Sequence, residues 1–136
     1  MENVLVDTGF LVALLSKRDQ YHAWAIAQVR AHPHPWHTCE AALTEAFHLL
    51  EDEGGGPQIA ALLSRGVLNV DFHFEDEMSW VLDMMKKYSE VPMSLADGCL
   101  VRMTETFSDP MLLSTDSDFK VYRRMGRKVI PCRMPA

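Results

Sequence analysis

The feature that most constrains the fold is a short apolar run ending in a carboxylate, Val4-Leu5-Val6-Asp7. A continuous apolar run of this length predicts a strand buried on both faces, as in a parallel sheet. Thr8 and Gly9 form the turn into an apolar helix over residues 10–15. Asp7 is therefore expected at the carboxyl end of a strand, where open α/β sheets bind ligands. In that position it either caps the helix or holds a cation.

Strands and helices alternate along the rest of the chain. Further helices are predicted over about residues 20–31, 40–53, 57–65 and 94–104, and a long one begins at residues 75–77. Further strands are predicted near residues 36–39, 67–70, 111–114 and 128–131. Another helix is expected after Asp116, with Gly126 as its stop signal. The alternation predicts one α/β domain over residues 1–136, with a mainly parallel sheet.

Composition narrows the class of protein. The chain has 136 residues, is 48% hydrophobic and carries a net charge of −6, which argues against coating nucleic acid by bulk charge. Its three cysteines are widely spaced and odd in number, which predicts reduced thiols in a cytoplasmic protein. No apolar run approaches the roughly 20 residues that cross a bilayer, so no membrane association is expected. Three histidines over residues 32–37 match no zinc signature and indicate a solvated turn.

Three aspartates stand at predicted helix starts. Asp7 and Asp116 each follow an apolar strand, and Ser94 with Asp97 fits a capping box. Each acid could be only a cap, but the carboxyl ends of parallel strands meet at one edge, which brings Asp7 and Asp116 together. Crowded carboxylates raise at least one pKa unless a cation intervenes. Oxygen ligands without Cys or His suit Mg²⁺ or Mn²⁺, which can polarise a phosphoryl oxygen and activate water.

Four segments together resemble the PIN-domain ribonucleases, most closely the small VapC-type toxins of toxin–antitoxin pairs. They are VLVDTGFLVALL, ALTEAFHLL, MSLADGCLV and LLSTDSDF, in the family's order and spacing. The resemblance implies a three-layer, Rossmann-like α/β/α fold and metal-dependent cleavage of RNA. It also implies a homodimer and a cognate antitoxin protein as partner.

The resemblance also assigns roles to individual residues. It implies an acidic catalytic and metal site of Asp7, Glu45, Asp97 and Asp116, with Asp118 as a possible fifth ligand. The helical pattern over residues 40–53 places Glu45 at the rim of the core, away from open solvent. Thr8 and Ser114 match the hydroxyl residues that hydrogen-bond these acids in the family. The chain departs from the family at Ser94, often an acid, and at Gly98, usually Ala.

The ribonuclease has three alternatives. One is a PIN-fold module that binds RNA or protein without catalysis, although all four acids are present. The others are phosphoryl-transfer domains. A receiver needs a mid-chain acceptor Asp with a lysine near the acids, and a haloacid-type phosphatase needs a second Asp at position 9, which is Gly.

A ribonuclease with an acidic cleft needs cations for its substrate. Six of the thirteen basic residues lie in the last seventeen positions. If a helix follows Asp116, its period places Lys120, Arg123 and Arg124 on one side, where they could bind RNA phosphates or form an ordinary solvated face.

Overall fold

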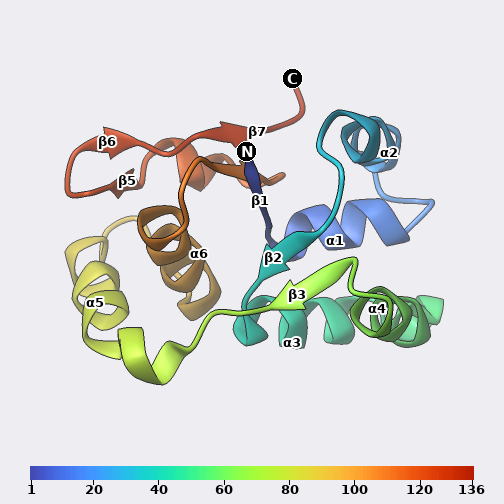
Figure 1. The fold of residues 1–136 in the computed structure, drawn as a ribbon, viewed down its shortest axis with the longest axis horizontal. Coiled ribbons are helices and arrows are strands. Elements are labelled where there is room, and N and C mark those ends of the chain that lie inside the picture. Colours follow the sequence, from blue (N-terminus) through green and yellow to red (C-terminus); the bar gives the residue numbers. More distant parts are fainter.

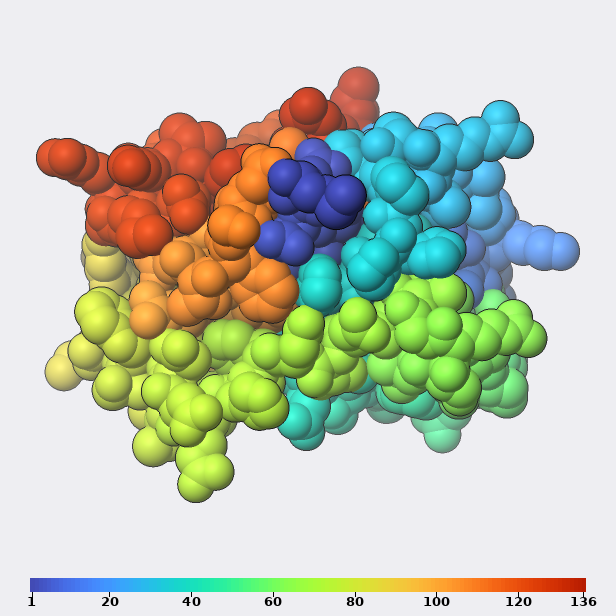
Figure 2. Space-filling view, in the orientation of Figure 1, coloured from blue at the N-terminus to red at the C-terminus, as the bar shows by residue number.

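The computed structural model describes all 136 residues and contains a five-stranded sheet in the order β3-β2-β1-β4-β7 (Figure 1). Every neighbouring pair in this sheet is parallel. The strands are β1 (Asn3–Val6), β2 (Trp36–Thr38), β3 (Leu68–Val70), β4 (Pro110–Leu113) and β7 (Cys132–Arg133). In the space-filling view of Figure 2, the N-terminal residues (dark blue) lie between the chain around β2 (cyan) and the chain leading into β4 (orange).

Six α-helices connect and cover the strands. They are α1 (Thr8–Leu15), α2 (His22–Ala31), α3 (Glu40–Leu49), α4 (Gly55–Ser64), α5 (Phe74–Lys87) and α6 (Leu95–Thr106). Two 3₁₀ turns follow α3 and β4, η1 (Glu51–Glu53) and η2 (Ser117–Lys120). The predicted α/β fold with a mainly parallel sheet is confirmed. None of the helices is long and apolar enough to cross a membrane.

Side chains from the two faces of the sheet enter separate cores. Val4 and Val6 point to the side where α1, α3 and α4 pack, whereas Leu5 points to the side of α5 and α6. This alternation is the two-residue period of a strand. Since helices bury both faces, the strands read as continuous apolar runs, and the predicted three-layer α/β/α arrangement is confirmed.

The strand order reverses beside β1. The chain passes from β1 to β2 and β3 in one direction, then returns to place β4 on the other side of β1. Such a reversal opens a crevice at the carboxyl ends of the two central strands. The register pairs Val6 with Leu113, so the next residues, Asp7 and Ser114, meet at this crevice.

The prediction of a helix after Asp116 is wrong. The chain makes only η2 there and then a two-stranded antiparallel hairpin, β5 (Arg123–Arg124) and β6 (Lys128–Val129). Met125 and Gly126 have φ of 52° and 81°, and the Arg127 amide donates to the Arg124 carbonyl. These are the features of a type I′ turn. Gly126 therefore supplies a turn conformation and does not end a helix.

Two element boundaries also differ from the predictions. Helix α3 ends at Leu49, and η1 occupies the remainder of the segment that was predicted to be helical through residue 53. The last strand of the sheet is Cys132–Arg133, whereas residues 128–129 belong to the hairpin.

At Gly98, a Cβ atom would lie 3.0 Å from Val81 Cγ1, so this glycine allows α5 and α6 to pack closely.

Candidate functional site

Asp7 is a buried carboxylate at the end of the central strand. It is the N-cap of α1, where its Oδ1 accepts a hydrogen bond of 2.8 Å from the Phe10 amide. Its Oδ2 accepts a second hydrogen bond, of 2.5 Å, from the Ser114 hydroxyl. Asp7 therefore caps a helix, and both of its oxygens also have lone pairs that these bonds leave free.

Ser114 connects the two strand ends. Its side chain is buried, and its Oγ accepts a 2.9 Å hydrogen bond from the Asp116 amide while donating to Asp7. Asp116 in turn caps η2, since its Oδ1 accepts from the Asp118 amide at 2.9 Å. One hydroxyl thus fixes the loop after β4 relative to the carboxylate after β1.

Asp97 enters the site from the first turn of α6. The predicted capping box is present: the Ser94 hydroxyl accepts from the Asp97 amide, and Asp97 Oδ2 accepts from the Ser94 amide at 3.2 Å. The Tyr122 hydroxyl lies 3.3 Å from the same Oδ2 and 3.1 Å from the Pro92 carbonyl oxygen. Both partners hold the carboxylate in one orientation at the start of α6.

Glu45 approaches the acids from α3. Its Oε2 lies 3.4 Å from Thr8 Oγ1, and the Thr8 hydroxyl donates to the Ala42 carbonyl at 3.0 Å. The expectation that Glu45 avoids open solvent is wrong, because this residue is exposed. The hydrogen bond from Thr8 to the Ala42 carbonyl fixes α3 so that Glu45 lies at the open rim of the site.

These side chains line one cleft with a volume of about 450 Å³. Six acidic residues contribute to its wall, and none of its lining residues is Lys, Arg or His. The six are Asp7, Asp19, Glu45, Asp97, Asp116 and Asp118. The structure therefore brings together all five acids predicted from the sequence, at the edge where β1 and β4 end.

Burial and mutual repulsion act on the protonation of the acids. Burial raises the pKa of Asp7 to about 7, although hydrogen bonds from Ser114 and Phe10 lower it, and the charges of Asp116 and Asp97 raise it further. Burial also raises the pKa of Asp97, and the charge of Asp116 adds to this effect. The charge of Asp116 therefore disfavours the ionisation of both Asp7 and Asp97, as expected for crowded carboxylates.

Two residues at the cleft were not predicted as site residues. Asp19 lines the cleft from the loop after α1. Gly9 lies where a Cβ atom would collide with the Thr115 hydroxyl oxygen. A glycine just inside an otherwise apolar helix signals such a close approach, whereas no local pattern distinguishes Asp19.

The predicted basic residues are not part of the cleft wall. Arg123 Nη1 donates to backbone carbonyls of residues 120–122, and the Arg124 guanidinium donates to the Thr104 carbonyl. The premise that Lys120, Arg123 and Arg124 share a helix face is wrong, because no helix forms there. No set of three His, Cys, Asp or Glu side chains is arranged so that it could hold a metal ion as it stands.

Comparisons with known proteins identify the fold. No protein-family model matches the chain, and no curated protein matches it. Among solved structures, the chain is similar to Mycobacterium tuberculosis VapC20, described as a sarcin-ricin loop cleaving toxin, with a TM-score of 0.76 and 21% identity. The match covers 88% of this chain and 94% of that chain. This likeness confirms the fold predicted from the sequence: the chain has the fold of a PIN domain.

Proposed function

We propose that this protein is a Mg²⁺- or Mn²⁺-dependent endoribonuclease and the toxin of a toxin–antitoxin pair. The observation that carries the proposal is the convergence of Asp7, Asp97 and Asp116 at the strand-order reversal. The likeness to VapC20, described as a sarcin-ricin loop cleaving toxin, supports the same conclusion. The proposal requires that the acids fit a divalent cation and that the cleft admits RNA.

The chemistry of the donor set fits a hard divalent cation. All the candidate ligands are carboxylate oxygens, which Mg²⁺ and Mn²⁺ prefer. The hydrogen bonds of Asp7 use one lone pair on each oxygen and leave others available. Burial is the main reason that the pKa of Asp7 is raised, and a cation would offset the repulsion from Asp116 and Asp97 that adds to this effect. The carboxylate side chains would have to move to complete the ligand set.

Each residue then has a definite part in hydrolysis. Asp7, Asp97 and Asp116 would hold the cation, with Asp118 as a further ligand. When bound, the cation would polarise the scissile phosphate and lower the pKa of a water molecule. Glu45, at the open rim, would complete the ligand set or orient the attacking water by accepting its hydrogen bond. Ser114 and Tyr122 would keep the aspartates in position through their hydroxyl groups.

An RNA cleavage assay tests this function. Wild-type protein should cut RNA with Mn²⁺ or Mg²⁺ and lose this activity in EDTA. Asp7→Asn should abolish cleavage while circular dichroism shows an intact fold, because Asn can still cap α1 but lacks the charge. Asp83→Asn, an exposed position on α5, is the matched control and should cut normally. Full activity of folded Asp7→Asn would contradict the assignment, and RNA binding without cleavage would support the non-catalytic module.

The proposal includes two protein partners. We expect a homodimer and a cognate antitoxin that covers or enters the acidic cleft. Light scattering should give twice the chain mass, and a monomer at every concentration would refute the dimer. The product of the adjacent gene should form a complex with this chain and inhibit RNA cleavage; a failure to bind would refute the antitoxin assignment.

A further inference from the structure

The acidic cleft contains no cationic side chain that could bind the phosphates of an RNA substrate. Its wall contains six acids and no cationic side chain. Even with a bound divalent cation, phosphates on either side of the scissile bond would face uncompensated carboxylates. Nucleic-acid binding relies on Lys and Arg contacts to phosphates. Basic residues at the margin of the cleft must therefore supply this contact.

Arg124 lies too far along α6 to do so, and the Arg123 guanidinium is already bonded to the backbone carbonyls of residues 120–122. The Arg124 guanidinium is bound to the carbonyl of Thr104, near the C-terminal end of α6. The Met125 amide binds Glu105 at 2.6 Å, one residue further along α6. Since an α-helix rises 1.5 Å per residue, this end lies roughly 12 Å from Asp97 along the helix axis. The hairpin thus belongs to the opposite end of α6 from the acids.

Arg133, in contrast, lies at the same sheet edge as the acids. It pairs with Leu113 in the parallel register of β4 and β7, and its carbonyl accepts a 3.2 Å hydrogen bond from the Ser114 amide. Ser114 is the residue that holds Asp7. β7 is the outer strand of the sheet, and Arg133 is exposed.

Lys120 reaches the same margin from η2. It follows Asp118 by two residues, and it is exposed. Burial raises the pKa of the Cys132 thiol, and the positive charges of Lys120 and Arg133 act on it in the opposite direction. Because Cys132 precedes Arg133 on β7, Lys120 lies near the same outer strand as Arg133, and this strand pairs with β4, which ends at the cleft.

We propose that Lys120 and Arg133 form a phosphate-binding margin that holds the RNA backbone next to the acidic cleft. This inference rests on the proposed ribonuclease function and replaces Arg123 and Arg124 as the contact residues. The two side chains would bind phosphodiester groups flanking the scissile one. They recognise charge and not base identity, so they set affinity and register along the strand.

The test measures RNA binding at several salt concentrations. Asp116→Asn would serve as the inactive parent, with a fluorescein-labelled single-stranded RNA of mixed sequence as the probe. Adding Lys120→Ala and Arg133→Ala should weaken binding at low salt and reduce the slope of log K against log salt by about 1.4, since each single-stranded contact contributes about 0.7. In the active protein, the double change should raise KM for RNA and leave kcat nearly unchanged.

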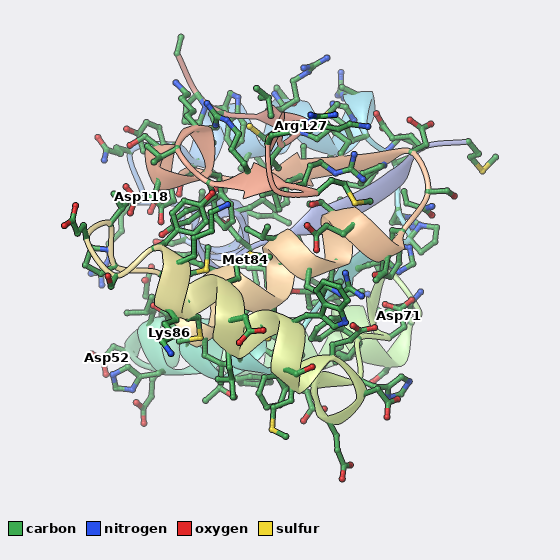
Figure 3. The ribbon with its side chains drawn as sticks, turned by 90° about the vertical axis from the view of Figure 1, so that its left-hand side faces the viewer. Asp52, Asp71, Met84, Lys86, Asp118 and Arg127 are labelled. Atoms are coloured by element: carbon green, nitrogen blue, oxygen red, sulfur yellow. The ribbon has the colours of Figure 1, made fainter.

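Arg127→Ala with Lys128→Ala is the matched control. It removes the same charge from exposed positions at the hairpin turn, and Figure 3 shows Arg127 well apart from Asp118. The control should retain the parental salt slope. Equal losses in both double variants would show a bulk-charge effect, and an unchanged slope in the Lys120–Arg133 variant would show that RNA lies elsewhere. Either result overturns the inference, and so does a parent variant that binds no RNA. If the wild-type protein still cleaves RNA, the proposed function is nevertheless retained.

Discussion

The Ser114 hydroxyl and the Asp7 carboxylate join two strand ends that are 107 residues apart in the chain, through a buried hydrogen bond of 2.5 Å. The same hydroxyl accepts from the Asp116 amide, so it positions two acids of the cleft at once. This contact exists because β1 and β4 are parallel neighbours whose register places residues 7 and 114 side by side. It makes the site depend on a residue that carries no charge.

Ser114→Ala tests this dependence. The change removes the donor to Asp7 and leaves the Asp116 amide without its acceptor, which should cost roughly 1–3 kcal/mol of unfolding free energy. Loss of the hydrogen bond should also raise the pKa of Asp7 further, because that bond stabilises the ionised form. The pH dependence of cleavage should then move to higher pH. Urea unfolding and a pH–rate profile measure the two effects, with exposed Ser79→Ala as control.

The raised pKa of Asp7 predicts how stability depends on pH without metal. In the folded protein this pKa is about 7, above the value of an unfolded aspartate, so folding takes up a proton between about pH 4 and pH 7. The stabilisation from the protonated group is complete below this range and is lost as pH rises through 7. In EDTA, the unfolding free energy of Asp7→Asn relative to that of wild type should increase by a few kcal/mol between pH 4 and pH 8. An equal pH response of both proteins in urea unfolding would contradict the shift.

Divalent cations should oppose the loss of stability that occurs as pH rises through 7. Ligand carboxylates must lose their protons before they bind metal, so the affinity for Mn²⁺ should rise as pH increases through 7. A ligand that binds only the folded state raises the melting temperature. Millimolar Mn²⁺ should therefore raise the melting temperature more at pH 8 than at pH 5.5, and the response should fall in Asp7→Asn. A melting curve indifferent to Mn²⁺ at pH 8 would count against a metal site.

The parts of the site that the sequence predicts are those set by short-range patterns. A buried apolar strand followed by an acid is visible at Asp7 and at Asp116, and parallel strands bring such acids to one edge. The capping box of Ser94 and Asp97 is likewise a local motif, and the structure contains it. Their convergence in one cleft follows from topology, which the alternation of strands and helices indicates.

The parts that the sequence does not predict depend on contacts between distant residues. Arg124 binds the Thr104 carbonyl, and Met125 binds Glu105, so the segment after η2 folds against α6 as a hairpin despite a helix-like spacing of apolar residues. Tertiary contacts override local propensity in such cases. The exposure of Glu45 depends in the same way on how Thr8 anchors α3.

The close approach of Gly9 to Thr115 yields the last prediction. A Cβ atom at position 9 would overlap the Thr115 hydroxyl oxygen, so Gly9→Ala requires the Thr115 side chain or the loop before Asp116 to move. We expect a loss of roughly 1–3 kcal/mol in unfolding free energy, with a larger loss of RNA cleavage, because this contact fixes Asp7 relative to Asp116. Thr115→Ala removes the obstructing oxygen, so the double variant should recover most of the stability and activity. If Gly9→Ala alone is as stable and active as wild type, or if Thr115→Ala gives no recovery, the overlap does not constrain the site.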